Sequence, residues 1–277
     1  MQIRVCRFGI VLALTIAGLV SGRVTASSQQ EIIFATTTST QDTGLLDVLV
    51  PRFEKQAGVQ VKVIAVGTGA ALRMGSTGDA DVVLVHAPEA EKVYVDSGDL
   101  VEGQRVMYNT FVVAGPPADP AGVRQQKSLM EAMRAIAAKG VFISRGDDSG
   151  THKKELALWT AAGVDSKTVK REETGQGMGA TLNVADQKRA YVLTDKATYL
   201  ALRKRLDLAI LFEGDPELRN VYTVYIVNPD KHKKVKAAPA RAFAEFLVSP
   251  EIQQIIGDFK REEFGESLFI PDARPRR

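Results

Sequence analysis

One stretch of the sequence decides the fold: Val141-Phe142-Ile143-Ser144-Arg145-Gly146-Asp147-Asp148-Ser149-Gly150-Thr151. Its first three residues form an apolar strand, and Lys153–Ala162 has the pattern of a helix. The stretch is therefore a strand-to-helix corner that carries an arginine, hydroxyl groups and glycines. Free N–H groups at a helix start carry partial positive charge, so Ser149, Gly150 and Thr151 predict a cradle for a small anion.

Arg145 is the charged group of this corner. Its planar guanidinium offers paired donors that suit an oxyanion. The alternative is an ion pair with Asp147 or Asp148 and a simple helix cap. We favour anion binding, because a cap needs one hydroxyl and this corner has several donors. The two aspartates would then hold the guanidinium or the turn, or accept a proton from hydrogen phosphate.

A second donor-rich corner lies near the start of the mature chain, at Thr36-Thr37-Thr38-Ser39-Thr40. Some of its hydroxyls can donate to an anion, or the run can simply cap a helix before Asp42. Two such corners, far apart in sequence, suggest one ligand held from two sides. The glycine-rich corners at 66–71 and 174–181 have two interpretations. Each is either a structural turn or a backbone contact to the same ligand.

Strand and helix patterns alternate along the chain, which predicts an α/β fold of parallel βαβ units. The predicted strands are Glu31–Ala35, Val59–Val66, Ala80–Val85, Gln104–Ala114, Val141–Ile143, Thr168–Glu172, Leu208–Phe212 and Tyr222–Val227. The predicted helices are Thr43–Gln56, Ala70–Gly75, Glu89–Ser97, Ser128–Lys139, Lys153–Ala162, Gly179–Gln187, Lys196–Arg205, Pro239–Leu247 and Pro250–Phe259.

The clearest break in this pattern is the proline-rich segment 115–120. A chain that crosses between two lobes there, and returns near residues 220–228, would have a hinge with a ligand cleft. We therefore predict two α/β lobes with a ligand cleft at the hinge. Lobe I would comprise 27–113 plus 224–277, and lobe II would comprise 114–223.

Residues 1–26 resemble a secretory signal peptide. Arg4 and Arg7 precede an apolar segment, Phe8–Val20, and small residues end at Ala26, where we expect cleavage. An uncleaved anchor is the less well supported alternative, because the apolar segment is short. The leader holds three basic residues and no acid, so its loss takes the net charge from +3 to zero. The mature chain therefore shows no overall attraction for nucleic acid.

Groups that would carry catalysis are scarce. Cys6, the only cysteine, leaves with the leader, so we expect no disulfide and no thiolate chemistry. His86, His152 and His232 lack metal-ligand spacing, and His86 is interpreted as a structural residue at a strand end. No nucleophile elbow or metalloprotease motif is present. We predict a binding protein, not an enzyme, with no metal site and no cofactor.

Several motifs, in the same order, resemble the periplasmic tungstate-binding proteins of ABC importers. They cover nearly the whole mature chain: Ala35–Asp42, Val66–Gly69, Gly78–Val82, Met107–Asn109, Ser144–His152 and Glu173–Leu182. The resemblance implies the two-lobed, type II periplasmic-binding α/β fold with an oxyanion at the hinge. It also implies no enzymatic turnover, and delivery to a permease in the inner membrane. The residues that it implies as anion contacts are Thr37, Thr38, Ser39, Thr68, Arg145, Ser149 and Thr151.

The resemblance alone points to tungstate. Molybdate, sulfate and phosphate remain open as ligands on physical grounds, because donors of this kind suit any small oxyanion. An exported enzyme that acts on a phosphorylated substrate is the alternative from another class. We expect a periplasmic monomer.

Overall fold

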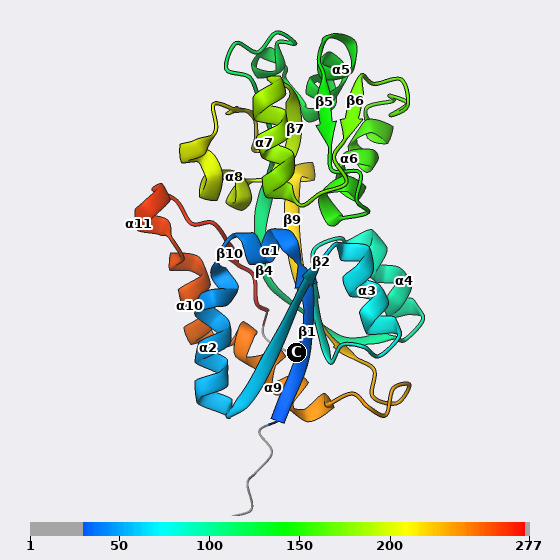
Figure 1. Cartoon of the computed structure of the whole chain (residues 1–277), viewed down its shortest axis with the longest axis vertical. Helices are drawn as coiled ribbons and strands as arrows, with labels where there is room; N and C mark the ends of the chain where they lie inside the picture. The colour runs from blue at the N-terminus through cyan, green and yellow to red at the C-terminus, as the bar shows by residue number, and fades with distance from the viewer. Residues whose placement is uncertain (1–29, 275–277) are drawn as a thin grey trace, which may run out of the picture.

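The structure is a computed structural model that describes residues 30–274, and the predicted leader lies outside this range. The described residues form two lobes that are joined by long strands (Figure 1). The strands follow one continuous order, β2-β1-β3-β9-β4-β7-β5-β6, with β8 and β10 paired to β4. Within residues 30–274, no helix is both long and apolar enough to cross a bilayer.

The strands are β1 (Gln30–Thr37), β2 (Val59–Val66), β3 (Val82–Val85), β4 (Leu100–Gly115), β5 (Phe142–Ser144), β6 (Arg171–Glu173), β7 (Tyr191–Asp195), β8 (Ala209–Phe212), β9 (Arg219–Val227) and β10 (Ile270–Pro271). The helices are α1 (Thr38–Asp42), α2 (Leu45–Ala57), α3 (Thr68–Ser76), α4 (Pro88–Asp96), α5 (Leu129–Lys139), α6 (Gly150–Ala161), α7 (Met178–Lys188), α8 (Lys196–Leu202), α9 (Ala237–Val248), α10 (Pro250–Asp258) and α11 (Arg261–Phe264).

The lower lobe of Figure 1 contains β1, β2, β3 and most of β4 and β9. Its sheet is mixed: β1 runs parallel to β2 and β3, whereas β9 runs antiparallel to β3 and β4. Helices cover both faces, and one core cluster contains the aromatic rings of Phe34, Phe53 and Phe243. The ring of Phe243 lies 5.0 Å from that of Phe34 and 4.9 Å from that of Phe53.

Replacing Phe243 with Ala tests this core. Phe243 is fully buried, so the change removes a large apolar side chain and leaves a cavity. We expect the free energy of unfolding to fall by about 3–5 kcal/mol. Urea unfolding followed by circular dichroism measures this, with Val93→Ala as the control. Val93 is 65% exposed, so its change should stay within about 0.5 kcal/mol. Equal losses in both variants would contradict this assignment of the core.

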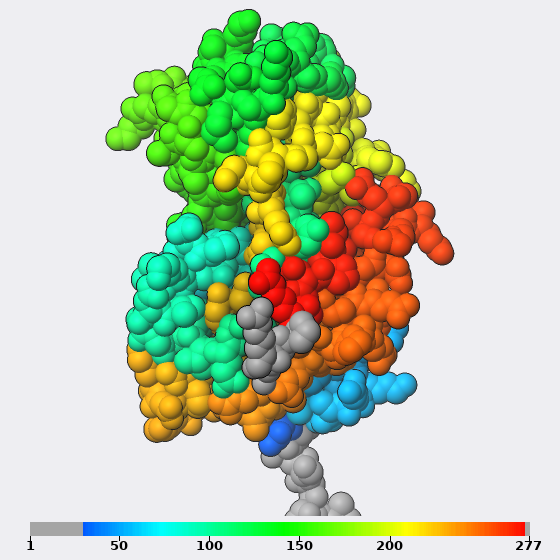
Figure 2. Space-filling view, turned by 180° about the vertical axis from the view of Figure 1, so that it is seen from behind, coloured from blue at the N-terminus to red at the C-terminus, as the bar shows by residue number. Residues whose placement is uncertain are grey.

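β4 and β9 connect the lobes. β4 pairs with β9 from Leu100 to Thr110, and from Phe111 onward it pairs with β7 and β8. β9 begins at Arg219, opposite Thr110. From behind, these strands bridge the narrow waist of the molecule, and the C-terminal segment covers them on the lower lobe (Figure 2). Both links between the lobes therefore lie side by side as one antiparallel pair.

The upper lobe is built on a small sheet in which β5 runs parallel to β6 and β7. One part of its core is a separate cluster that includes Phe142, Trp159 and Tyr191. Another part, with Ile143 and Val192, is continuous with the core cluster of the lower lobe. The rings of Phe142 and Trp159 meet edge to face at 5.2 Å. The Tyr191 hydroxyl accepts a hydrogen bond from the Ala121 backbone N–H at 2.7 Å, which ties the proline-rich segment to the sheet.

The predicted α/β fold is confirmed, with three corrections. The sheets are mixed rather than parallel, because both connecting strands run antiparallel to their neighbours. The sequence did not predict four short elements: β7 (Tyr191–Asp195), β10 (Ile270–Pro271), α1 (Thr38–Asp42) and α11 (Arg261–Phe264). The helix predicted over Lys196–Arg205 ends at Leu202, and a single 3₁₀ turn follows.

Candidate oxyanion-binding site

Both donor-rich corners are helix starts in the structure. Ser149 caps α6, and its hydroxyl oxygen accepts a hydrogen bond from the His152 N–H at 3.2 Å. Thr37 caps α1 in the same way, with the Thr40 N–H at 3.3 Å. The capping that the sequence left open is therefore present at both corners. It accounts for one hydroxyl at each corner and leaves the other donors to be explained.

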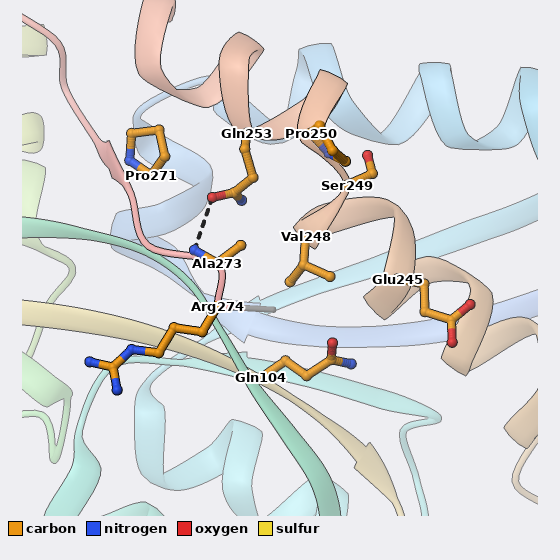
Figure 3. Close-up of a pocket in the computed structure, with 9 residues that line it drawn as sticks. All are labelled: Gln104, Glu245, Val248, Ser249, Pro250, Gln253, Pro271, Ala273 and Arg274. Carbon is orange, nitrogen blue, oxygen red and sulfur yellow. Dashed lines mark hydrogen bonds between the residues drawn. The ribbon is translucent and has the colours of Figure 1, made fainter. Parts of the chain in front are cut away.

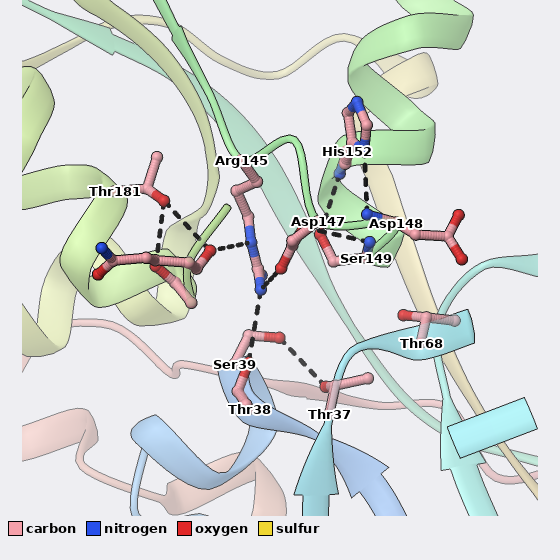
Figure 4. Close-up of polar contacts among 12 residues, drawn as sticks. Thr37, Thr38, Ser39, Thr68, Arg145, Asp147, Asp148, Ser149, His152 and Thr181 are labelled. Atoms are coloured by element: carbon pink, nitrogen blue, oxygen red, sulfur yellow. Dashed lines mark hydrogen bonds and ion pairs between the residues drawn. The ribbon is translucent and has the colours of Figure 1, made fainter. Parts of the chain in front are cut away.

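Arg145 extends from the upper lobe toward the hydroxyl run of the lower lobe (Figure 4). Its side chain is only 3% exposed. Nη2 lies 2.5 Å from Asp147 Oδ2 and makes a longer contact of 3.5 Å with Thr38 Oγ1. Nε donates to the carbonyl oxygen of Gln176 at 3.2 Å. These bonds hold a buried positive charge at the contact between the lobes.

The ion pair that the sequence analysis gave as the alternative to anion binding is present, between Arg145 and Asp147. Asp147 also accepts the Ser149 N–H through Oδ1 at 3.2 Å, so each of its carboxylate oxygens has a partner. Asp148 instead pairs with Lys153, and lies 3.9 Å from Arg73. Asp147 therefore orients the guanidinium, and Asp148 ties the start of α6 to α3.

The two lobes touch at the site. The Gly150 N–H donates to Thr68 Oγ1 at 2.8 Å, which joins α6 of the upper lobe to α3 of the lower lobe. On the outer edge of the contact, Lys196 lies 2.8 Å from Glu266. The structure therefore shows the lobes closed on one another.

Thr151 has a buried hydroxyl group that needs an explanation. The residue is 1% exposed, and within residues 30–274 its Oγ1 has no hydrogen-bond partner. Burying a hydroxyl without a partner costs about 1–3 kcal/mol, so native proteins seldom do so without a reason. A ligand oxygen at the closed corner would supply the missing acceptor.

Several helix N-termini meet where the lobes touch. α3 begins beside α6, and α7 begins at Met178, where a Cβ added at Gly177 would lie 3.6 Å from Thr38 Oγ1. Each N-terminus carries unpaired N–H groups and a fractional positive charge. Together with Arg145 they make the contact region favourable for an anion. The glycine-rich segment 174–181, which the sequence left open, supplies the start of α7.

His86 lies at the centre of this region, a position that sequence reasoning missed. It follows β3 and is 3% exposed, with Nε2 3.2 Å from Thr37 Oγ1 and 3.4 Å from Ser39 Oγ. Burial lowers its pKa from 6.5 to about 4, and the Arg145 charge acts in the same direction. The imidazole is therefore neutral at physiological pH.

This shift makes the stability of the protein depend on pH. The unfolded chain protonates His86 near pH 6.5 and the folded protein only near pH 4, so the unfolded state binds more protons between these values. The free energy of unfolding should fall as the pH is lowered from 6.5 to 4, by about 3 kcal/mol from this group.

Urea unfolding across that pH range, compared with a His86→Asn variant, isolates the contribution. Glu91 has the opposite effect on the pH dependence of stability. Burial raises its pKa to about 7, so this group stabilises the folded protein as the pH is lowered. Both proteins contain Glu91, so its effect cancels in the comparison. A wild-type curve parallel to that of the variant would contradict a neutral buried His86.

Two hollows lie outside the corner itself. One, of about 250 Å³, adjoins His86 and Gly150 and is lined also by Lys153, Lys154 and Arg219. The other, of about 690 Å³, lies between the C-terminal segment and α9–α10 (Figure 3). None of the predicted site residues lines that second hollow. Among residues 30–274, no group of three or more His, Cys, Asp or Glu side chains could hold a metal ion.

The structure brings segments that carry the predicted site residues together where the two lobes touch. The lower lobe contributes four and the upper lobe contributes four: Thr37, Thr38, Ser39 and Thr68, and Arg145, Ser149, Gly150 and Thr151. Their contact with a ligand remains a prediction.

Comparisons with known proteins identify the class of protein and the family. A family model described as the PBP superfamily domain matches residues 24–251. The tungstate-binding protein TupA of Peptoclostridium acidaminophilum is 48% identical over 245 residues, which cover 87% of this chain and 86% of that protein. TupA of Campylobacter jejuni subsp. jejuni is 40% identical over 86% of this chain and 90% of that protein. The crystal structure of the tungstate ABC transporter from Geobacter sulfurreducens aligns with a TM-score of 0.76 and 49% identity, and covers 83% of this chain and 98% of that one.

Two lobes, two connecting strands and facing donor-rich corners define a solute-binding protein with the type II periplasmic-binding fold. Proteins of this class bind their solute without transforming it, and this chain is not an enzyme. Within the class, the chain belongs to the family of the tungstate-binding proteins.

Proposed function

We propose that this protein captures tungstate in the cleft between its lobes and delivers it to the permease of an ABC importer. The observation that carries the proposal is the buried guanidinium of Arg145, which is held against the hydroxyl run of the opposite lobe. The tungstate named for the relatives at 40–49% identity supports this choice of anion.

The proposed contacts divide between the lobes. Arg145 supplies the full positive charge, and Thr151 donates its hydroxyl proton to a ligand oxygen. The start of α6 at Ser149 and Gly150 adds its fractional charge and backbone donors. From the other lobe, hydroxyl groups complete the set: Thr37, Thr38, Ser39 and Thr68.

The energetics suit tight binding. Each hydrogen bond to a charged group contributes about 1.5–3 kcal/mol. Several together reach about −12 kcal/mol, or nanomolar affinity, after the cost of ordering is subtracted. Because the donors come from both lobes, bound ligand favours the closed form, and we propose that the permease recognises that form.

The partners of Asp147 and Asp148 make these carboxylates less available to accept a proton from the ligand. Hydrogen phosphate needs an acceptor for its proton, and the sequence offered Asp147 or Asp148 for this role. In the structure both Asp147 oxygens already accept hydrogen bonds, from Arg145 and from the Ser149 N–H. Asp148 forms an ion pair with Lys153. Tungstate carries no proton at neutral pH and needs no such acceptor.

The remaining parts of the proposal concern the whole protein. We propose a monomer in the periplasm, released from its leader after Ala26. We further propose that the hinge lies where the strand pairing changes, at Thr110–Phe111 and at Leu218–Arg219. These positions lie three and five residues before the boundaries predicted from the sequence, which divide the lobes into 27–113 plus 224–277 and 114–223.

Calorimetric titration of the mature protein tests the ligand. Tungstate should bind with nanomolar affinity, and sulfate and phosphate at least a thousandfold more weakly. Molybdate bound more tightly than tungstate would move the assignment to molybdate. No heat with any of the four anions would refute the proposed function.

A further inference from the structure

A chain of buried polar side chains crosses the hinge. It begins at Asp195, at the end of β7, and passes through Asn109 of β4 and Asn220 of β9 to His86. Asn109 Nδ2 donates to Asp195 Oδ1 at 3.4 Å, and Asn220 Nδ2 donates to Asn109 Oδ1 at 2.8 Å. His86 Nδ1 lies 2.9 Å from Asn220 Oδ1. All four side chains are at least 96% buried.

The hydrogen bonds in this chain can run in only one direction. Asp195 Oδ1 is an acceptor, because it also receives the Thr198 N–H at 2.8 Å. Asn109 must therefore turn its amino group toward Asp195 and its oxygen toward Asn220. Asn220 then donates to Asn109 and presents its own oxygen to His86. His86 must therefore carry its proton on Nδ1, which leaves Nε2 as an acceptor.

That acceptor faces the hydroxyl run. His86 Nε2 lies 3.2 Å from Thr37 Oγ1 and 3.4 Å from Ser39 Oγ, so Thr37 is the nearer donor. A threonine has one hydroxyl proton, and when Thr37 gives it to His86 its oxygen can only accept. Thr40 Oγ1, at 2.7 Å, and the Thr40 N–H supply hydrogen bonds to that oxygen. Ser39 Oγ also lies 3.1 Å from Thr37 Oγ1, but the two hydrogen bonds from Thr40 occupy both lone pairs of that oxygen. The proton of Ser39 is then available to another partner.

We propose that His86 is a positioning residue for the oxyanion: it takes the Thr37 proton, so that Ser39 presents its O–H group to the ligand. The inference rests on the proposed function and deepens it. It revises the proposed set of contacts at one position: Ser39 donates directly to the ligand, whereas Thr37 is a supporting residue that holds His86 and Thr40 in place.

The tautomer of His86 provides a direct test without ligand. In water, neutral histidine prefers the proton on Nε2, so the hinge chain imposes the less common form. Nitrogen NMR of protein labelled in the histidine rings should show a protonated Nδ1 and an unprotonated Nε2. The ring is identified by its contact with Tyr222, which stacks on it at 4.6 Å. A proton on Nε2 would overturn the proposal, whether or not tungstate binds.

Two substitutions separate positioning from simple packing. In His86→Gln the longer side chain can place an amide oxygen near the Nε2 position, and tungstate affinity should stay within about threefold of wild type. His86→Asn keeps a donor for Asn220 but has no acceptor for Thr37, and affinity should fall by about tenfold or more.

Calorimetry measures both affinities at neutral pH, with His232→Asn as the matched control. The His232 ring packs against Gly78, and it is remote from the residues proposed to bind the anion. Loss of the His232 ring should therefore leave the tungstate affinity unchanged. Equal losses in the Gln and Asn variants would overturn the proposal, since packing alone would then explain His86. A wild-type protein that ignores tungstate would refute the proposed function and leave the tautomer result standing.

Discussion

Replacing Arg145 with Ala should weaken tungstate binding by at least a hundredfold. The guanidinium is buried and is the charged donor nearest to the hydroxyls of the opposite lobe. Two charge-assisted hydrogen bonds to the ligand would be lost, which costs about 3–6 kcal/mol. The carboxylate of Asp147 would also lose its cation and would then repel a dianion. Isothermal titration calorimetry measures the affinity directly.

Arg145→Lys and Arg134→Ala complete this experiment. Lysine keeps the charge but loses the Nε–H bond to Gln176 and the paired donor geometry, so the loss should be intermediate. Arg134 lies on α5 and donates to the carbonyl of Ala162, so its removal should leave affinity unchanged. Wild-type affinity in Arg145→Ala would remove this residue from the site.

Replacing Gly150 with Val should prevent the lobes from closing. Even a Cβ at this position would lie 3.0 Å from His86 Cε1 and 3.2 Å from Thr68 Oγ1, both in the opposite lobe. The His86 ring cannot move aside, because it is hydrogen-bonded to Asn220 and stacked on Tyr222. Overpacking of about 1–3 kcal/mol would act on the closed form alone. Tungstate affinity should therefore fall by roughly 5- to 150-fold, with an unchanged melting temperature for the free protein.

A second glycine at the same contact gives the control. A Cβ at Gly177 would sit 3.6 Å from Thr38 Oγ1, which is an ordinary contact distance. Gly177→Ala should therefore bind as wild type does, while Gly150→Ala should fall between wild type and Gly150→Val. Small-angle scattering with saturating tungstate should show a larger radius of gyration for Gly150→Val. A compact, tightly binding Gly150→Val protein would show that Gly150 does not limit closure.

The sequence predicted much of the fold because most elements carry their own local signals. Ser128 and Gly140 delimit α5, and apolar runs mark β3 and β5. Strand β7 gave no such signal. The preceding helix, α7, ends at Lys188 and is capped by Arg189, a non-glycine residue with φ of 50°. Helix α8 begins directly after Asp195. Without glycine or proline at either end, a short buried strand is hard to tell from a continuing helix.

Strand direction was beyond the reach of local patterns. Apolar periodicity is the same for a parallel and an antiparallel strand, and the pairing of Leu100 with Val227 joins residues far apart in the chain. The antiparallel connecting strands therefore appear only in the folded structure.

The site was partly predictable for a similar reason. Its donors lie in two compact runs, where several hydroxyls and an arginine stand out against the need for a single cap. The hinge chain has no such concentration: Asn109, Asp195 and Asn220 are single polar residues in three separate strands. A lone histidine after a buried strand is more often structural, and only the contact of His86 with Thr37 distinguishes it.

The division of donors between the lobes also determines how the cargo can be unloaded. The Arg145 charge is already partly offset by Asp147, so much of the grip on a dianion comes from helix ends and hydroxyl dipoles. The attraction between a charge and a dipole decays faster with distance than that between two charges, and the helix-end effect fades within about one turn. A modest separation of the lobes would therefore remove most of the attraction between the protein and the anion. A permease that separates the two lobes would therefore receive the anion in a single step, not through slow dissociation.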